Sequence, residues 1–210
     1  MIYVPKKMTV KKHIKIIVLL IGFMVGLTAQ AQPVALRTNL LYDATLSPNI
    51  AVDVRVDSAW TVGLVGGLNA WDIDKAKNKK WRHFLVGPQV RHWLNDSLWH
   101  RQFIGIDLVY SHYNVGNVKF PFGLFKEVRD HRLQGDLIAL FVSYGYSWWL
   151  SSRMRLEAEV GMGMGYAWFR KYDCDHCGQD YGKDARPFLL PKLGLNLAIN
   201  LGKRKVKSEE

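Results

Sequence analysis

Glu157 and Glu159 are two carboxylates spaced two residues apart, a spacing that places both on one face of a β-strand. Such a pair can serve as a general acid and base, or line a path for ions. Basic residues in similar number follow the same parity in other segments. Because ion pairing keeps a carboxylate charged, we expect a structural network of paired charges, with no catalytic residue in it. Its predicted members are Arg37, Asp53, Arg55, Arg91, Asp107, Arg155, Glu157, Glu159 and Lys192.

Ser111 and His112 are a second candidate for chemistry, because a hydrolase uses a serine nucleophile with a histidine base. Adjacent residues of a strand face opposite ways, so the two side chains could cooperate only if the strand ended before them. No orienting third group can be assigned from the pattern. A lipid-modifying barrel enzyme therefore stays as the alternative function.

Cys174 and Cys177 are the two cysteines of the chain, in the run Cys174-Asp175-His176-Cys177. In an exported protein the first interpretation is a disulfide that holds a loop. Metal binding and free thiols are the alternatives, although zinc usually takes four ligands and there is one such cluster. We expect neither a metal nor a cofactor.

A second loop carries aromatic residues between lysines. Exposed, it would form a surface patch for a partner; folded over a barrel mouth, it would be the core of a lid, and both interpretations stay open. The patch consists of Lys119, Phe120, Phe122, Phe125 and Lys126. A lysine-rich segment between residues 75 and 80 could meet the phosphates of lipopolysaccharide, or be a solvated run of charge.

The elements that must position these residues are long segments in which apolar side chains alternate with small or charged ones. Alternation with period two is the pattern of a β-strand with one apolar face. Eight segments show it: Val34–Tyr42, Ile50–Val56, Trp60–Trp71, Trp81–Leu94, Ile104–Tyr110, Ile138–Trp148, Met154–Trp168 and Leu189–Leu201. Short and long connections follow one another along the chain, as in an antiparallel up-and-down barrel. Pro88 and Pro191 fall inside strands, where proline is tolerated only at a bulge or an unpaired position.

The N-terminal segment is predicted to lie outside the fold. Five lysines, an apolar run and Ala29-Gln30-Ala31 are typical of a secretory signal peptide cleaved after residue 31. The remainder has 24 basic and 18 acidic residues, a net charge of +6, so most of the basicity belongs to the signal. An exported, mildly basic chain is a poor nucleic-acid binder. We expect one barrel domain over residues 32–202 and a basic periplasmic tail over residues 203–210.

The polar face of the segments separates a membrane barrel from a soluble one. A soluble exterior would be dense in Lys and Glu, whereas this face is rich in Gly, Ala, Ser and Asn, as the filled interior of a small barrel requires. Aromatic residues gather near the strand ends on the apolar face, like the girdles of outer-membrane barrels. The sequence therefore predicts an all-β, eight-stranded transmembrane barrel. A soluble periplasmic lipid-binding barrel is the second alternative.

Several motifs resemble an uncharacterised Bacteroidetes family that is catalogued as a domain of unknown function. They are Ala35-Leu36-Arg37-Thr38-Asn39-Leu40-Leu41-Tyr42-Asp43-Ala44, Ser47-Pro48-Asn49, Lys80-Trp81-Arg82-His83, Gln89-Val90-Arg91-His92-Trp93, Ser143-Tyr144-Gly145-Tyr146 and the Cys174 to Gly178 loop. The resemblance covers essentially the whole chain after the signal. It implies an exported outer-membrane β-barrel, and a link to fimbrial or cell-envelope assembly, but it brings no catalytic residues.

Together these observations predict a small outer-membrane barrel with a plugged polar lumen. We expect it to act through its extracellular loops as a structural, anchoring or interaction protein. Its expected partners are outer-membrane lipids, lipopolysaccharide and a surface or fimbrial protein.

Overall fold

The computed structural model describes residues 34–74, 78–94, 98–118, 126–173 and 179–201. These residues form nine antiparallel strands and two helices of five residues each. In chain order they are β1 (Val34–Asn39), α2 (Leu40–Ala44), β2 (Asn49–Arg55), β3 (Trp60–Asn69), β4 (Asp72–Asp74), β5 (Lys79–Trp93), β6 (Arg101–Gly116), α3 (Lys126–Asp130), β7 (His131–Trp149), β8 (Met154–Asp173) and β9 (Asp180–Asn200). In this part of the chain no helix is long and apolar enough to span a membrane. The predicted signal segment and basic tail lie outside the described residues.

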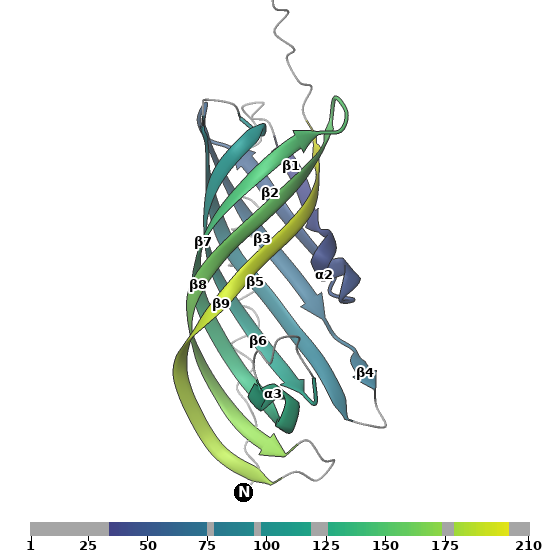
Figure 1. Ribbon diagram of the computed structural model, residues 1–210, viewed down its shortest axis with the longest axis vertical. Helices are drawn as coiled ribbons and strands as arrows, with labels where there is room; N and C mark the ends of the chain where they lie inside the picture. The colour runs from purple at the N-terminus through teal and green to yellow at the C-terminus, as the bar shows by residue number, and fades with distance from the viewer. Residues whose placement is uncertain (1–33, 75–77, 95–97, 119–125, 174–178, 202–210) are drawn as a thin grey trace, which may run out of the picture.

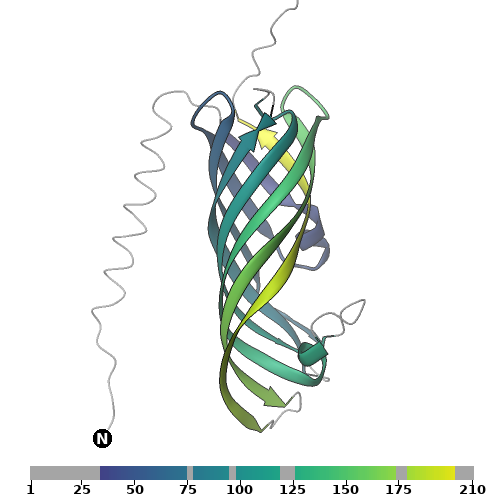
Figure 2. The same cartoon turned by 60° about the vertical axis from the view of Figure 1, so that its left-hand side comes forward.

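Eight of the strands are joined into a closed ring of hydrogen bonds. Each ring strand pairs with its neighbour in the chain, β3 pairs with β5, and β1 pairs with β9. The short strand β4 adds to the edge of β5 outside this ring. Figures 1 and 2 show the tilted strands wound around one axis, with β1 beginning and β9 ending at the same end. The predicted all-β antiparallel fold is confirmed.

The strands extend further than their apolar alternation indicated. The structure continues β6 to Gly116, begins β7 at His131, continues β8 to Asp173 and begins β9 at Asp180. Residues 111–116, 131–137, 169–173 and 180–188 are therefore strand, although they lie outside the predicted segments. These extensions carry polar residues on both faces, so period-two hydropathy does not mark them.

The prediction of a strand through Tyr42 was wrong. The chain turns into α2 after Asn39, whose side chain accepts a hydrogen bond of 3.0 Å from the backbone N–H of Leu41. The amide of Asn49 in turn bonds the backbone N–H and C=O of Asn39. Asparagine caps of this kind begin a helix by satisfying its free backbone groups.

Both ends of the interior contain packed apolar clusters. At the end with the short turns, Trp93 and Phe103 lie 4.9 Å apart between ring centroids and pack with Ala35 and Trp99. At the opposite end Leu133 and Phe169 pack with Val128 of α3 and with other apolar side chains. The charged residues on the inward face lie between these clusters.

The aromatic cluster at the short-turn end makes a sharp packing prediction. A Cβ at Gly145 would lie 2.2 Å from Cζ of Phe103, so Gly145→Ala should lower the free energy of unfolding by about 1–3 kcal/mol. At Gly66 the nearest atom to a new Cβ is 4.0 Å away, so Gly66→Ala serves as the matched control and should change stability little. Denaturant titration of the two variants checks this, and equal stability would contradict the packing.

Candidate functional site

The inward face of the ring carries a cluster of four basic and four acidic side chains. All eight come from the predicted network, and seven of them have side chains exposed by 5% or less. The ring strands β1, β2, β5, β6, β8 and β9 each supply at least one member. We call it the charged cluster; it consists of Arg37, Asp53, Arg91, Asp107, Arg155, Glu157, Glu159 and Lys192.

Glu157 is the centre of one half of the charged cluster. Its Oε2 accepts from Nη1 of Arg91 at 2.8 Å and lies 3.8 Å from Nε of Arg37. Its Oε1 accepts from Nε of Arg155 at 2.7 Å. Three arginines from three strands thus converge on one fully buried carboxylate. A buried carboxylate held by three guanidinium groups is stabilised in its charged form, as expected of a structural ion pair.

Glu159 organises the other half. It accepts from Arg91 at 3.1 Å, from Nζ of Lys192 at 2.6 Å and from Oγ of Ser143 at 2.6 Å. Lys192 also donates to Oδ2 of Asp107. Arg91 therefore bridges the two glutamates, and the carboxylate pair is joined through guanidinium, not by a shared proton.

Arg37 of β1 and Asp53 of β2 connect these two strands to the other members of the charged cluster. Nε of Arg37 donates to Asp53 at 3.0 Å, and its Nη2 donates to the side-chain oxygen of Gln89. Two glycines leave room for these groups: a Cβ at Gly63 would lie 2.4 Å from Oδ1 of Asp53, and one at Gly105 would lie 2.7 Å from Oγ of Ser143. Small residues on the inward face are therefore needed for the cluster to fit.

Aromatic rings close the cluster toward the short-turn end. The guanidinium of Arg91 lies 4.5 Å from the ring centroid of Phe103, and that of Arg155 lies 4.9 Å from Trp99. Cations over aromatic faces keep part of their electrostatic stabilisation after they leave water. The charged cluster and the aromatic rings therefore pack against one another in this half of the interior.

Arg55 is the predicted member that the structure does not bring into the cluster. It lies at the end of β2, where its Nε donates to the backbone oxygen of Asp57 at 3.1 Å. It shares the inward parity, but at a strand end water can solvate the guanidinium. Without Arg55 the charges balance, with four basic and four acidic groups.

The other predicted candidates are not assembled into a site. Ser111 faces inward and donates to the backbone oxygen of Phe84, whereas the following residue, His112, faces outward. β6 continues past both, so they do not form a nucleophile and base pair. Cys174, Cys177 and the patch residues from Lys119 to Phe125 lie outside the described residues, and Lys126 begins α3. Among the residues the structure describes, no group of three His, Cys, Asp or Glu side chains could hold a metal ion.

A polar group on the outward face was not predicted. Asp136 accepts from the Tyr110 hydroxyl at 2.6 Å and from Nδ1 of His112 at 2.9 Å. The three residues lie on two neighbouring strands, and only the register of β6 against β7 brings them together.

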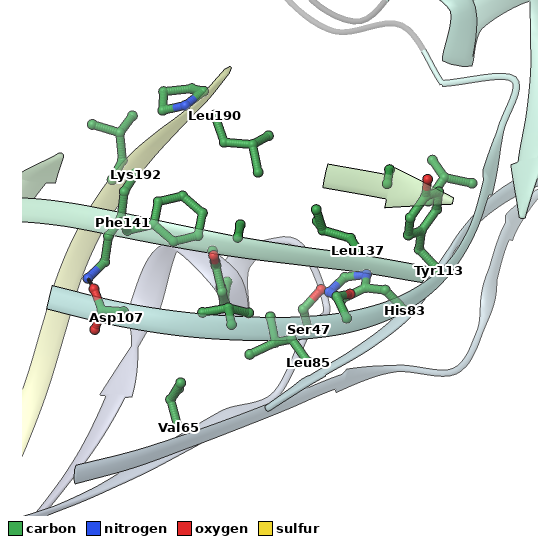
Figure 3. Close-up of a pocket in the computed structure, with 18 of the residues that line it drawn as sticks. Ser47, Val65, His83, Leu85, Asp107, Tyr113, Leu137, Phe141, Leu190 and Lys192 are labelled. Carbon is green, nitrogen blue, oxygen red and sulfur yellow. Dashed lines mark hydrogen bonds and ion pairs between the residues drawn. The ribbon is translucent and has the colours of Figure 1, made fainter. Parts of the chain in front are cut away.

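The sequence also gave no sign of a cavity of about 740 Å³ beyond the charged cluster, toward the end with the long strands. Asp107 and Lys192 lie at its inner end, and apolar side chains such as Leu85, Leu137 and Phe141 line its walls (Figure 3). Burial raises the pKa of Tyr113, another lining residue, to about 12, so its phenol is neutral at physiological pH. One half of the lumen therefore holds the charged cluster and the other half holds a cavity, whereas a plugged lumen is what the sequence predicts.

A protein-family model described as "Protein of unknown function (DUF3575)" matches residues 16–201. The chain belongs to this family. No curated protein and no solved structure matches the chain. The DUF3575 description carries no activity, so the function must be argued from the charged cluster, the cavity and the outward face.

Arg91 should be the residue whose loss harms the charged cluster most, because it bridges Glu157 and Glu159. We expect Arg91→Met to lower the free energy of unfolding by about 3–5 kcal/mol, since two buried carboxylates lose their shared partner. Arg82 is the matched control, because it makes an exposed ion pair with Asp72 and Arg82→Met should cost about 0–1 kcal/mol. Equal losses in denaturant titration would contradict the assigned role.

Proposed function

We propose that this chain is a transmembrane β-barrel of the outer membrane that does not conduct ions and serves as an anchored surface protein. One observation carries the proposal: the ring has its charges inside and its exposed large apolar side chains outside. A protein surrounded by water has the reverse distribution. A lipid bilayer favours this one, because a ring of paired strands satisfies most backbone groups internally and its outward side chains are mainly apolar.

The outward apolar band is continuous around the long strands. On β8 the exposed side chains include Val160, Met162 and Met164, and on the paired strand β7 they include Leu140 and Val142. The exposed fractions are high: Met162 is 67% exposed and Met164 is 71% exposed. So large an exposed apolar surface is a contact surface for membrane or protein.

Aromatic side chains lie at both ends of this band. Tyr146 and Trp148 lie toward the short-turn end of β7, with ring centroids 4.6 Å apart. Tyr166 and Trp168 lie toward the other end on β8, 5.0 Å apart. Asp136 is the register partner of Trp168, so its polar group lies level with the outer member of this second pair. Aromatic girdles at two levels, followed by polar residues, fit the two interfaces of a bilayer.

The soluble lipid-binding barrel is the less favoured alternative for the same reason. Such a barrel needs an outward face rich in charge and an apolar interior. Here the charged cluster alone places eight charged side chains on the inward face, while the outward face of β7 and β8 between Leu156 and Tyr166 holds none.

The charged cluster and the aromatic rings beside it support a lumen that is closed to ions. With the chain ends and short turns in the periplasm, the end with long strands, β4 and α3 faces outward from the cell. This end would contact lipopolysaccharide and a surface or fimbrial partner, which makes anchoring or interaction the function that the geometry favours over catalysis.

A charge placed in the band distinguishes a membrane from water. In a bilayer Met162→Arg should lower the free energy of unfolding by about 2–4 kcal/mol, because the guanidinium would lie near the midplane. Gln134→Arg is the matched control: Gln134 faces outward on β7 beyond the band, and the change should cost no more than about 0.5 kcal/mol. Folding of both variants into vesicles, followed by denaturant titration, measures the difference.

The two variants also show how the proposal fails. If the outward face met water, Arg at the 67% exposed position of Met162 would be harmless, and both variants would be as stable as the parent protein. Equal stability of the three proteins would thus contradict the membrane assignment.

If the lumen is closed, the protein should show no ion conductance. Purified protein in planar bilayers should give no sustained conductance steps, while a porin handled in the same way should, because the ion-paired side chains leave no continuous water path. Regular steps whose size follows salt concentration would show an open lumen and overturn the non-conducting role.

A further inference from the structure

The lining surface of the cavity beyond the charged cluster is mostly apolar, although polar side chains such as His83, Tyr113 and Arg186 also contribute to it. Inward-facing side chains from β5, β6, β7 and β9 line the cavity, among them Leu85, Val109, Leu137, Phe141 and Leu190. Its volume of about 740 Å³ lies within the range of about 300–1,000 Å³ that is usual for ligand sites. An apolar space of this size favours a hydrocarbon ligand over ordered water.

The ring is complete only over part of its height on the side of β9. β1 pairs with β9 from Ala35 opposite Asn200 to Asn39 opposite Asn196, and then the chain turns into α2. The Asn39 side chain continues the contact by one step, bonding the backbone of Leu193 and Leu195. Beyond this point, within the described residues, β9 pairs with β8 alone. Figure 1 shows β9 running past α2 along this side.

Two prolines lie on the free edge of β9. The backbone N–H groups of Leu195 and Leu201 point toward β1, donating to Asn39 and Val34. Every second residue of a strand points its N–H the same way, so Pro187 and Pro191 occupy positions that would otherwise present unpaired donors. Proline inside a strand requires a bulge or an unpaired position, and Pro191 lies at the unpaired edge. Prolines here oppose the addition of another strand.

The cavity reaches around this edge to the outside of the ring. Pro191 and Leu193 share the outward parity, yet they line the same cavity as the inward-facing Phe188 and Leu190. The surface they join is apolar: Leu189 is 65% exposed and Leu193 is 59% exposed. The cavity therefore reaches the outward apolar band beside α2, which contacts β9 and contributes Tyr42 to the lining.

We propose that the cavity binds an acyl chain of a membrane lipid, which enters sideways past the proline edge of β9. This inference rests on the proposed membrane location, because the bilayer is the source of the chain. The apolar walls fit hydrocarbon, and burial of each methylene contributes about 0.8 kcal/mol. The inner end of the cavity, formed by the charged cluster, offers no net charge to a lipid headgroup, because its basic groups are matched by acidic ones. The lipid headgroup therefore stays at the outer interface while one chain occupies the cavity.

Photolabelling inside a bilayer tests this proposal. The full chain is reconstituted into lipid nanodiscs containing a phosphatidylcholine with a diazirine midway along one acyl chain, irradiated, and digested for mass spectrometry. We expect adducts on inward-facing Leu137, Phe141 and Leu190, in addition to adducts on the outward band.

A pair of neighbouring substitutions provides the control. Leu190→Trp places a larger ring in the cavity and should reduce the adducts on Leu137 and Phe141 by about tenfold. A tenfold loss corresponds to about 1.4 kcal/mol of lost binding free energy for the acyl chain. Leu189→Trp adds the same ring to the outward face of the same strand and should leave them unchanged.

The outcomes separate this inference from the proposed function. Adducts confined to the outward face in the parent protein would overturn the acyl-chain site and leave the barrel in place. Adducts on neither face would contradict both. Inward adducts that persist equally in Leu190→Trp and Leu189→Trp would overturn the assignment of this cavity.

Discussion

The two glutamates of β8 are the interaction on which the rest of the structure depends. Glu157 and Glu159 hold arginines and a lysine that come from opposite sides of the ring, and Arg91 joins the two carboxylates. Burying eight charges costs several kcal/mol for each ion, which only complete pairing offsets. The need for pairing explains the exact balance of four basic and four acidic groups. It also explains the small residues around them, because a side chain at Gly63 or Gly105 would occupy the space of Asp53 or Ser143.

The same interior is divided into two halves with different chemistry. Toward the short turns, the interior holds ion pairs and the packed rings of Trp93, Phe103 and Trp99. Toward the long strands the side chains become aliphatic and a cavity opens. The change coincides with the place where β1 ends at Asn39 and the ring loses one wall. The early end of β1 thus accounts for a lateral opening in a ring whose other half is closed. The proposed function and the further inference concern these two different halves.

Much of this arrangement follows from the sequence, because alternation reports which face of a strand is apolar. The parity of Glu157 and Glu159 placed them inside, together with the arginines that pair with them. Arg55 has the same parity but lies at a strand end, where parity no longer decides solvent access. The strand extensions near Arg170 and Gln134 escaped prediction because they are polar on both faces. Asn39 ends β1 through a side-chain cap, which hydropathy does not record.

The cavity and the outward group of Asp136 could not be predicted for a different reason. Both depend on the register between strands and on side-chain volumes summed over several strands. The order of residues in the sequence reports neither the register nor the summed volume directly. Pro191 came nearest to a signal, because a proline within a strand indicates a missing partner. In the structure the missing partner is β1, which ends at Asn39 and leaves this part of β9 unpaired on one side.

The central claim is that the outward face meets lipid. The most direct measurement is fractionation of cells that make the protein, followed by electrophoresis of unheated and heated samples. The account predicts that the protein is recovered in the outer-membrane fraction and migrates differently before and after heating, as a closed barrel does when it resists detergent. Recovery in the soluble periplasmic fraction, with the same mobility in both samples, would contradict it.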